Sequence, residues 1–502
     1  MTGNLMKLQN GSDVRGVACE GIEGESVNVT EEAANVIGQA FVLWLAKKTH
    51  KDPASLTLAI GRDSRITGEK LAKAAAAGIA AKGAKVINCN LATTPAMFMS
   101  IVFEQTKFAG SLMVTASHLP FNRNGIKFFD AAGGLEHEDI EEILKTATGL
   151  DPVTKEDPFE KDFDLLSLYA SHLKNTICRE LGASEEQKPL SGLKIVVDAG
   201  NGAAGFFVTK ILQPLGADTT GSQFLEPDGM FPNHIPNPEN KQAMQSIQKA
   251  TVENKADLGL IFDTDVDRMS AVFADGSEVN RDSIIALVSA ILAPDFPGGT
   301  IITDSVTSDR LTVFLEKTLG LKHLRFKRGY KNVIDKCREL NEAGVISPLA
   351  METSGHGALK DNYYLDDGAF LAVKLIVALA RASREGKKID SLIEKLPPAG
   401  VERELRFKIN TEDFKAYGKE VLAAFKTRAQ ERKYDLPETF EGVRVSFHGG
   451  EADGWFLLRL SLHDPVMPLN VEAKTEHDMS SILAIVKELL TGFDKLDTAC
   501  LG

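Results

Sequence analysis

Residues 109–127 read AGSLMVTASHLPFNRNGIK, an apolar run that opens into a polar segment. The run ends at the β-branched Val114 and predicts a buried strand whose carboxyl end delivers Ser117 to a loop. Pro120 and the Asn124-Gly125 pair are turn signals, so we expect no regular element there and an exposed Ser117. Ligands bind at this edge of an open α/β sheet. Because an ordinary polar loop would show the same pattern, the function of this stretch depends on the rest of the chain.

The composition is that of an ordinary soluble globular protein. The 502 residues are 43% hydrophobic and 25% charged, with a formal net charge of −13, and this length suggests three or four domains. The acidic balance argues against a nucleic-acid binder, and the apolar runs are too short to span a bilayer. The five cysteines contain no C-x-x-C pair, so neither a disulfide framework nor a thiolate zinc site is indicated. With no apolar signal segment at the start, we expect a cytoplasmic protein with no nucleic-acid or membrane partner.

Strand and helix patterns alternate along the first 150 residues. Thr30 is expected to cap a helix whose apolar stripe includes Trp44. A strand is expected over 56–60, a helix over 68–81 and a second strand over 85–89. This alternation predicts βαβ units and a largely parallel sheet.

The same plan recurs twice further along the chain. Three strands run into a polar turn that carries an aspartate, at Asp63, Asp198 and Asp304. Their separation is roughly that of a small domain. We therefore expect three related α/β domains, over residues 1–165, 166–291 and 292–398.

The pattern changes after Pro397-Pro398. Apolar and polar residues alternate over 401–409, 443–447 and 455–462, and helices are expected at about 411–432 and 476–492. An antiparallel sheet with one solvated face has this alternation. Residues 399–502 are therefore expected to form a fourth domain, of the α+β kind.

An acidic loop, Asp263-Thr264-Asp265-Val266-Asp267-Arg268, follows the apolar run 258–262. Three carboxylates at alternate positions of an extended segment would project to one side and form an oxygen cage suited to Mg²⁺. A calcium loop of the EF-hand type would need glycine at position 268 and glutamate at position 274, where the chain has Arg268 and Ala274. A solvated acidic turn is the remaining alternative, although three like charges this close repel unless a cation neutralises them.

A metal held by three aspartates would give Ser117 a role. A lone serine hydroxyl is a poor nucleophile, but a phosphoryl group carried on it becomes transferable when a cation offsets its charge. A hydrolase triad fits less well, because His118 is adjacent to Ser117 and its ring would point away from the hydroxyl in an extended loop. The surrounding residues are also not a G-x-S-x-G elbow.

Two further loops carry groups suited to a phosphosugar. Glu352 and Ser354 place a carboxylate and a hydroxyl two residues apart, and Gly355 allows close backbone approach, which suits vicinal sugar hydroxyls. An ordinary polar turn is the alternative. Arg459 and Ser461 offer a guanidinium fork and a hydroxyl for a phosphate, although Arg459 alone could be an exposed strand residue.

Together these stretches resemble the α-D-phosphohexomutase superfamily, which includes phosphoglucomutase/phosphomannomutase enzymes. The family's phosphoserine loop, Thr-Ala-Ser-His-Asn-Pro, is matched by Thr115–Pro120, and its metal loop, Asp-Gly-Asp-x-Asp-Arg, by Asp263–Arg268. Its sugar loop, Gly-Glu-x-Ser-Gly-His, is matched by Met351–His356. The resemblance extends from Asp13 to the Arg459 loop, nearly the whole chain. It implies three Rossmann-like mixed α/β domains and a C-terminal domain resembling the TATA-binding-protein fold.

The chain departs from the family's motifs at several positions. Leu119 stands for Asn, Thr264 for Gly and Met351 for the first Gly of the sugar loop. In the phosphate loop, usually Arg-Pro-Ser-Gly-Thr-Glu-Pro, the residues Leu462-His463-Asp464 replace Gly-Thr-Glu. Losing the glycine removes backbone freedom and losing the threonine removes a donor that His463 could replace. The departure leaves the preferred phosphosugar open.

The resemblance implies a role for each loop. Ser117 would carry the phosphoryl group and ligate Mg²⁺ together with Asp263, Asp265 and Asp267. Charge stabilisation and proton transfer would fall to Lys127, Arg15 and His118. The residues implied to bind the sugar and its phosphate are Arg268, Arg328, Tyr330, Lys331, Glu352, Ser354, His356, Arg459 and Ser461.

The implied activity is a Mg²⁺-dependent phosphohexomutase that interconverts hexose 1-phosphate and hexose 6-phosphate. The reaction would pass through a phosphoserine enzyme and a hexose 1,6-bisphosphate, with the C-terminal domain closing over the cleft to exclude water. A glucose 1,6-bisphosphate synthase would have the same parts. A non-catalytic phosphosugar-binding protein would not need the metal cage, and a phosphatase of the aspartyl type would leave Ser117 unmodified. The choice among glucose, mannose and glucosamine phosphates stays open, as does that between monomer and homodimer.

Overall fold

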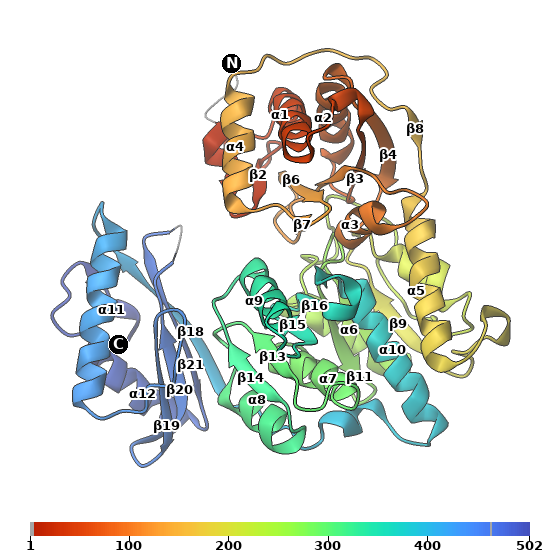
Figure 1. Ribbon diagram of the computed structural model, residues 1–502. Coiled ribbons are helices and arrows are strands. Elements are labelled where there is room, and N and C mark those ends of the chain that lie inside the picture. The colour runs from red at the N-terminus through yellow and green to blue at the C-terminus, as the bar shows by residue number, and fades with distance from the viewer. Residues whose placement is uncertain (1–4, 462–463, 502) are drawn as a thin grey trace. The chain divides into compact units, whose positions relative to one another are not determined.

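The computed structural model describes residues 5–461 and 464–501, whose helices and strands are labelled in Figure 1. The chain divides into two compact units. The first unit comprises Met1–Asn280, Ser354–Gly357 and Leu365–Asp390. The second comprises Arg281–Thr353, Ala358–Tyr364 and Ser391–Gly502. Each unit contains three segments, so neither is a continuous piece of chain.

The first sheet of the first unit is mixed rather than largely parallel. Its strands, in spatial order, are β1 (Gln9–Asn10), β2 (Asp13–Val17), β6 (Arg123–Asp130), β5 (Gly110–Val114), β3 (Thr57–Arg62), β4 (Lys85–Leu91) and β8 (Lys161–Asp162), with β7 (Gly133–Gly134) paired to β6. Strand β3 runs parallel to β4 and β5, but β6 runs antiparallel to β5 and to β2. The expectation of a largely parallel sheet is wrong here because a short loop, not a crossover helix, joins β5 to β6.

The Asn124-Gly125 pair lies inside β6 and does not break it, contrary to expectation. A Cβ added to Gly125 would lie 2.1 Å from the carbonyl oxygen of Val14 on the neighbouring strand. Asn124 donates to Thr67 Oγ1 at 2.8 Å. Glycine is therefore required at this position by the close approach of another backbone rather than by a turn.

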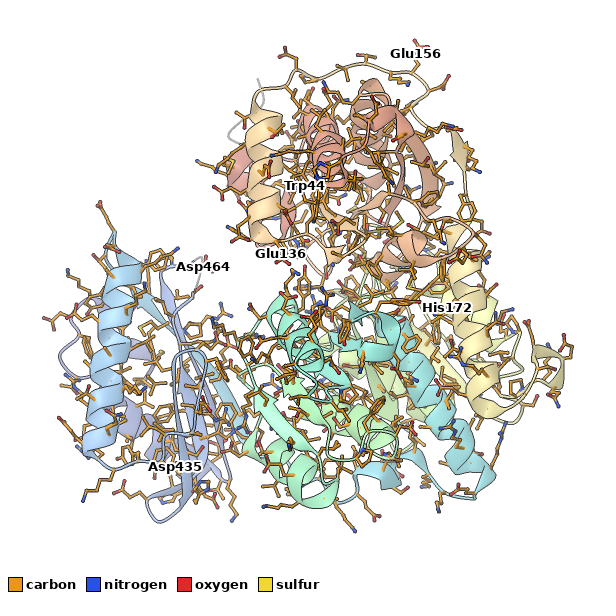
Figure 2. The ribbon with its side chains drawn as sticks, in the orientation of Figure 1. Trp44, Glu136, Glu156, His172, Asp435 and Asp464 are labelled. Carbon is orange, nitrogen blue, oxygen red and sulfur yellow. The ribbon has the colours of Figure 1, made fainter. Side chains whose placement is uncertain are left out.

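Helices α1 (Glu31–Thr49), α2 (Gly68–Ala81), α3 (Thr94–Val102) and α4 (His137–Thr148) accompany this sheet. Thr30 caps α1 as predicted, its side chain accepting from the amide of Ala33 at 3.2 Å. Trp44, labelled in Figure 2, is 6% exposed and stacks on Phe41 with ring centroids 6.0 Å apart. The apolar stripe of α1 therefore forms the core beneath the sheet, as its spacing predicts.

The second sheet of the first unit carries the acidic loop. Its order is β12 (Glu278–Val279), β11 (Met269–Phe273), β10 (Leu258–Phe262) and β9 (Ile195–Asp198). Strand β10 is parallel to β9 and antiparallel to β11, so the loop between β10 and β11 is a tight reversal. Helices α5 (Leu165–Leu181) and α10 (Gly368–Arg384) lie side by side, and α6 (Lys241–Glu253) packs on the sheet (Figure 1).

The second unit begins with a parallel sheet. Strand β13 (Thr300–Thr303) lies between β14 (Lys322–Arg325) and β15 (Leu349–Met351) and is parallel to both. Its helices are α7 (Asp282–Leu292), α8 (Asp309–Val313) and α9 (Tyr330–Glu342). Two short strands follow along the chain, β16 (Gly357–Leu359) and β17 (Leu365–Asp366).

The C-terminal sheet is antiparallel throughout, as predicted. Its order is β19 (Val443–Gly449), β20 (Ala452–Leu458), β21 (Val466–Ala473), β18 (Val401–Ile409) and β22 (Leu496–Asp497). Helices α11 (Phe414–Glu431) and α12 (Glu476–Leu489) cover one face (Figure 1). The sequence pattern did not predict β21, in which Pro468 interrupts the alternation and lacks an amide hydrogen.

The mixed α/β architecture with a separate sheet-rich C-terminal part agrees with the predicted fold class. The boundaries of the four domains stay a prediction. All five cysteines are unpaired, as their spacing indicated. Within the described residues, no helix combines the length and the apolar character needed to cross a membrane.

Candidate active site

The loop that carries Ser117 follows β5 directly and is buried. Ser117 is 2% exposed, so the expectation of an exposed position is wrong. Its backbone has a φ of 50°, in the left-handed region that residues other than glycine rarely adopt. The amide of Ser117 donates to Thr115 Oγ1 at 2.9 Å. This contact holds the serine in a turn rather than in an extended loop.

The turn at Ser117 changes the position of the neighbouring imidazole. His118 Nδ1 lies 3.2 Å from Ser117 Oγ, so the expectation that the ring points away is wrong. That expectation assumed an extended loop, in which adjacent side chains project in opposite directions. Burial, together with the charges of Arg268 and Arg15, lowers the pKa of His118 to about 2. The imidazole is therefore neutral at physiological pH.

The acidic loop between β10 and β11 bends its carboxylates toward one point. Asp263, Asp265 and Asp267 are buried, and one ligand atom from each lies within 4.8 Å of the others. The segment is a turn and not the extended strand that we expected, because Val266 has a φ of 66°. A β-branched residue in the left-handed region is a strained position. The three carboxylates still converge as predicted.

Ser117 and the acidic loop meet within the first unit. Ser117 Oγ donates to Asp263 Oδ2 at 2.8 Å. Arg268 Nη2 donates to the same hydroxyl oxygen at 3.2 Å and also contacts His118 Nδ1. The two loops come from different sheets, so the tertiary structure places the hydroxyl beside the carboxylates.

Basic side chains from the first sheet face the acidic loop. Lys127 on β6 contacts Asp267 and lies 3.2 Å from Asp265 Oδ2. Burial opposes its charge, but Asp265 and Asp267 raise the pKa of Lys127 well above its usual range. Arg15 on β2 forms a 2.8 Å ion pair with Asp13, and its charge is felt at Lys127. Both residues named by the resemblance therefore lie at this site.

The donor set fits a divalent metal ion. Asp265 Oδ1 and Asp267 Oδ1 are buried and have no hydrogen-bond partner in the part of the chain that the structure describes. Three carboxylates exceed by one the two cationic side chains paired with them, Lys127 and Arg268. Buried oxygen ligands with uncompensated negative charge suit a hard cation.

Part of the predicted sugar loop also belongs to the first unit. Ser354 Oγ lies 2.9 Å from His356 Nδ1, and His356 Nε2 lies 3.6 Å from Asp267 Oδ1. Burial and the charge of Arg268 lower the pKa of His356. These two side chains therefore border the acidic loop.

The other half of the sugar loop lies in the second unit. Glu352 is 5% exposed and accepts a hydrogen bond from the amide of Gly329 at 2.7 Å. Arg328 precedes that amide, and Tyr330 and Lys331 form the first turn of α9. These four predicted residues are therefore brought together by the start of one helix.

Arg459 and Ser461 lie in the C-terminal part of the second unit. Burial and the charge of Arg328 lower the pKa of Arg459, so two guanidinium groups lie near each other. Ser461 Oγ accepts from the amide of Asp464 at 3.2 Å. An anion bound here would reduce the repulsion between the guanidinium groups. The predicted donor His463, with Leu462, lies outside the described residues.

The sequence did not reveal two residues that support the site. Thr94 at the start of α3 donates its amide to the backbone carbonyl of Asp265 at 2.9 Å, and its hydroxyl donates to the side-chain carboxylate of the same residue. The pair Thr93-Thr94 before Pro95 is a helix-start signal, but such a signal does not say what the first turn faces. The second residue is Arg65, which follows β3 and donates hydrogen bonds to backbone carbonyls of the Ser117 loop.

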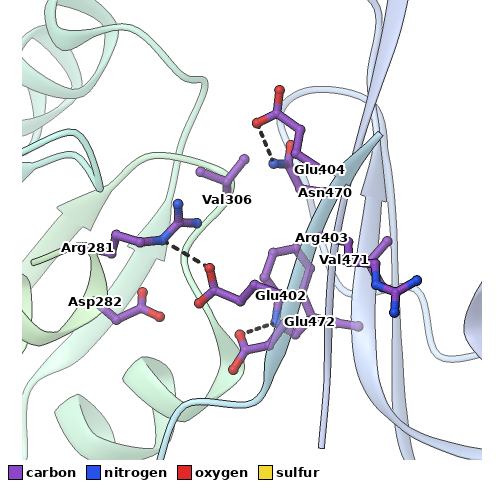
Figure 3. A pocket seen from close by; sticks show the side chains of 10 residues that line it. Arg281, Asp282, Val306, Glu402, Arg403, Glu404, Asn470, Val471 and Glu472 are labelled. Carbon is purple, nitrogen blue, oxygen red and sulfur yellow. Dashed lines mark hydrogen bonds and ion pairs between the residues drawn. The ribbon is translucent and has the colours of Figure 1, made fainter. Parts of the chain in front are cut away.

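A separate hollow of about 210 Å³ lies within the second unit, between the start of α7 and the open face of the C-terminal sheet (Figure 3). Glu402 on β18 lies 3.2 Å from the Nε of Arg281. Glu472 on β21 accepts from Trp455 Nε1 at 3.0 Å and from the amide of Gly400 at 3.2 Å. These carboxylates are already engaged, so we assign no substrate to the hollow.

Comparison with known proteins gives consistent matches along the chain. The models for phosphoglucomutase/phosphomannomutase alpha/beta/alpha domains I, II and III match residues 6–152, 167–276 and 280–399. A phosphomannomutase/phosphoglucomutase of Pseudomonas putida is 30% identical and aligns over 86% of this chain and 87% of that protein. A probable phosphoglucosamine mutase of Methanosphaera stadtmanae is 27% identical over 97% of this chain and 99% of its own.

Solved structures give the same result for the fold. The crystal structure of a phosphoglucomutase/phosphomannomutase family protein from Burkholderia thailandensis superposes with a TM-score of 0.78, 26% identity and 98% coverage of both chains. The chain therefore belongs to the phosphoglucomutase/phosphomannomutase family, within the α-D-phosphohexomutase superfamily. It is a phosphohexomutase, an isomerase of carbohydrate metabolism whose three buried aspartates can hold a metal ion.

Proposed function

We propose that this phosphohexomutase interconverts the 1-phosphate and 6-phosphate of an α-D-hexose, with Ser117 as the phosphoryl carrier. The observation that carries the proposal is the 2.8 Å hydrogen bond from Ser117 Oγ to Asp263, inside a cluster of three buried carboxylates. A serine without such a cluster would be a poor phosphoryl carrier, because nothing would offset the charge of the transferring group.

In the proposed cycle, phospho-Ser117 donates its phosphoryl group to the free hydroxyl of the bound hexose phosphate. The Oγ–P bond breaks, the sugar hydroxyl loses its proton and forms a new O–P bond, and Ser117 Oγ takes up a proton. The resulting hexose 1,6-bisphosphate returns its other phosphoryl group to Ser117, with the proton exchange reversed. Added 1,6-bisphosphate would therefore act as an activator, because it phosphorylates the free serine. We propose Mg²⁺ as the metal held by Ser117, Asp263, Asp265 and Asp267, where it would neutralise phosphoryl charge.

The side chains around Ser117 have separate roles in this proposal. Arg268 Nη2 lies 3.2 Å from Ser117 Oγ and stabilises negative charge that develops on that oxygen. His118 stays neutral, with its Nδ1 3.2 Å from Ser117 Oγ. The burial and neighbouring charges that lower its pKa make it a weak base, so its part in proton transfer is that of a hydrogen-bonding partner. Lys127 stays charged beside Asp265 and Asp267 and stabilises phosphate oxygens. Arg15 adds positive charge on the same side.

Substrate recognition is proposed for two groups of residues. Glu352 and Ser354 would bind the sugar's 3- and 4-hydroxyls, and His356 belongs to the same stretch of sequence. The distal phosphate would be held by Arg328, Tyr330, Lys331, Arg459 and Ser461. Because the relatives are named for glucose, mannose and glucosamine phosphates, we propose glucose and mannose phosphates as substrates. Comparing the kcat/KM values of all three 1-phosphates would test this choice.

We further propose that the enzyme acts in the cytoplasm as a monomer or homodimer. Five unpaired cysteines are usual in a reducing compartment. A net charge of −13 gives no reason to expect nucleic-acid binding.

The decisive experiment is peptide mass spectrometry on purified protein, together with assays of Ser117→Ala. We expect a phosphoryl group on Ser117 and a loss of mutase activity of at least about 10³-fold in the variant, because the covalent route is removed. Fructose 1,6-bisphosphate supplied with glucose 1-phosphate should give no accumulation of glucose 1,6-bisphosphate, whereas a synthase that uses this donor would accumulate it together with fructose monophosphate. A Ser117→Ala enzyme that interconverts the two phosphates at the parent's rate would overturn the proposal.

A further inference from the structure

One arginine side chain holds the whole Ser117 loop from its buried side. Arg65 is 1% exposed and follows β3. Its Nη2 donates to the carbonyl oxygens of Ser117 at 2.5 Å and Leu119 at 2.6 Å. Its Nη1 donates to those of Pro120 at 2.7 Å and Arg123 at 2.9 Å. A single guanidinium group therefore donates hydrogen bonds to four backbone carbonyls.

Other contacts hold the far end of this loop. The Asn122 carbonyl accepts from the amide of Ala18 at 2.8 Å, Asn122 Nδ2 donates to Glu25 Oε2 at 2.7 Å, and Arg123 donates its amide to the Pro120 carbonyl at 3.0 Å. Residues 116–122 form no helix or strand, and within the loop Leu119 donates its amide to Ala116 at 3.2 Å. Four carbonyl dipoles pointed at one place repel each other and, when buried, need a donor. The planar fork of a guanidinium group supplies several donors in fixed directions, which a lysine ammonium group cannot reproduce.

The charge of Arg65 is balanced by a residue that also reaches Ser117. Asp63 is fully buried, with its Oδ2 3.3 Å from Arg65 Nε. Thr115 Oγ1 donates to Asp63 Oδ2 at 2.6 Å and accepts from the amide of Ser117 at 2.9 Å. The amide and the carbonyl of Ser117 are therefore both fixed, one through Thr115 and Asp63 and the other by Arg65 directly.

Arg65 also contacts the segment around Phe231, which is linked through Asn201 and Ala203 to the acidic loop. Its guanidinium carbon lies 5.2 Å from the ring centroid of Phe231, a cation–π distance. The Phe231 segment hydrogen-bonds to the loop at Asn201, since Asp228 donates its amide to the Asn201 carbonyl at 2.9 Å. Two residues on, Ala203 donates its amide to the carbonyl of Thr264 at 2.8 Å.

We propose that Arg65 is a positioning residue for phosphoryl transfer: it holds the left-handed turn at Ser117 and thereby presents the hydroxyl to Asp263. The inference rests on the proposed role of Ser117 as the phosphoryl carrier. Arg65 itself touches neither the hydroxyl nor the carboxylates of the acidic loop, so it acts through the backbone. Its loss should change the rate of transfer more than the affinity for substrate.

The test compares Arg65→Lys with Asn35→Ala, a control in the same unit. Asn35 is buried and donates to the carbonyls of Ala74 and Val153 at 3.0 Å, away from the Ser117 loop. We expect Arg65→Lys to lower kcat by about 100-fold with KM changed less than about threefold. Hydrogen–deuterium exchange should rise in the peptide containing residues 117–123. The control should lose thermal stability without either effect.

A second variant covers the case in which Arg65→Lys does not fold. Asp63→Asn/Arg65→Ala removes both buried charges together, which proteins tolerate better than removal of one. Low concentrations of guanidinium chloride should restore part of its kcat, while ammonium chloride should not. No recovery, or equal recovery with ammonium, would count against a fork-shaped contact.

The outcomes separate this inference from the proposed function. Full kcat in Arg65→Lys, or a loss no larger than that of the control at equal melting temperature, would overturn the positioning role. Unchanged exchange at residues 117–123 would overturn it as well. If wild-type protein carries no phosphoserine and still has mutase activity, the proposed function fails, whereas raised loop exchange in Arg65→Lys would still establish what holds the loop.

Discussion

At the scale of single residues, the acidic cluster contains two carboxyl groups whose pKa values are shifted in opposite directions. Burial, reinforced by the charges of Asp267 and Asp265, raises the pKa of Asp263 well above its usual range. Burial acts on Asp267 as well, but Lys127 and His356 hold its pKa well below its usual range. Ionised Asp263 therefore costs stability near neutral pH, whereas ionised Asp267 contributes stability that is lost as the pH falls through its pKa.

We predict that neutralising these two groups has opposite effects in the absence of metal. Asp263→Asn should raise the melting temperature in EDTA, because one of three repelling charges is removed. Asp267→Asn should lower the free energy of unfolding by roughly 1–3 kcal/mol, because Lys127 loses a buried partner. Thermal unfolding with and without Mg²⁺ measures both effects, and the stabilisation by Mg²⁺ should shrink in each variant. A lower melting temperature for Asp263→Asn in EDTA would contradict the repulsion.

At the scale of elements, the close approach of β2 to β6 leaves no room for a side chain at Gly125. A Cβ at Gly125 on β6 would meet the Val14 carbonyl on β2 at 2.1 Å, while one at Gly134 on β7 would find its nearest neighbour, a Phe129 ring carbon, at 3.9 Å. Neither glycine has a left-handed backbone. The two positions therefore differ in the room available for a Cβ atom and not in the sign of φ.

We predict that Gly125→Ala lowers the free energy of unfolding by about 1–3 kcal/mol or more, because β2 must move away from β6. Gly134→Ala should change it by less than about 0.5 kcal/mol. Urea unfolding of both variants measures the difference. Since β2 carries Arg15 and β6 carries Lys127, Gly125→Ala should also reduce mutase activity. Equal stability of the two variants would contradict the close approach.

Local sequence patterns predicted the elements whose own residues determine them. The helix 68–81 and the strand 401–409 have the predicted bounds, since each has a clear period and a clear stop. The pattern failed at Gly125 and Ser117, where a neighbouring backbone or a distant arginine decides the conformation. The convergence of the three aspartates could be predicted from their spacing, but the left-handed Val266 between Asp265 and Asp267 could not.

At the scale of the whole molecule, the two tryptophans report on different parts. Trp44 lies in the core of the first unit, whereas Trp455 lines the hollow of the second unit between α7 and the C-terminal sheet. Trp455 is 5% exposed, and the guanidinium carbon of Arg444 lies 3.8 Å from its ring centroid. Arg444 and Trp455 lie on neighbouring strands of one sheet and would move together, whereas Val306, outside that sheet, packs against Trp455. Movement of the C-terminal sheet during the expected closure would alter the contact with Val306 and hence the emission of Trp455.

We predict that a saturating hexose phosphate changes the fluorescence of a Trp44→Phe variant, in which Trp455 is the remaining tryptophan. The proposed closure depends on phosphate binding by Arg459, so the additional change Arg459→Ala should abolish the signal and raise KM. Stopped-flow titration measures both quantities. A variant that turns over substrate at the normal rate with constant Trp455 emission would argue against closure of the C-terminal sheet.

The interleaving of the two units bears on how the protein is made. Each unit contains three segments, so the chain passes between them five times before it ends. On the ribosome, Ser117 and the aspartates emerge early, but His356 and α10, which complete the same unit, follow only after the first seventy-odd residues of the other unit. A nascent chain released before Asp390 therefore holds an unfinished catalytic half, and no single proteolytic cut can yield two intact, separable halves.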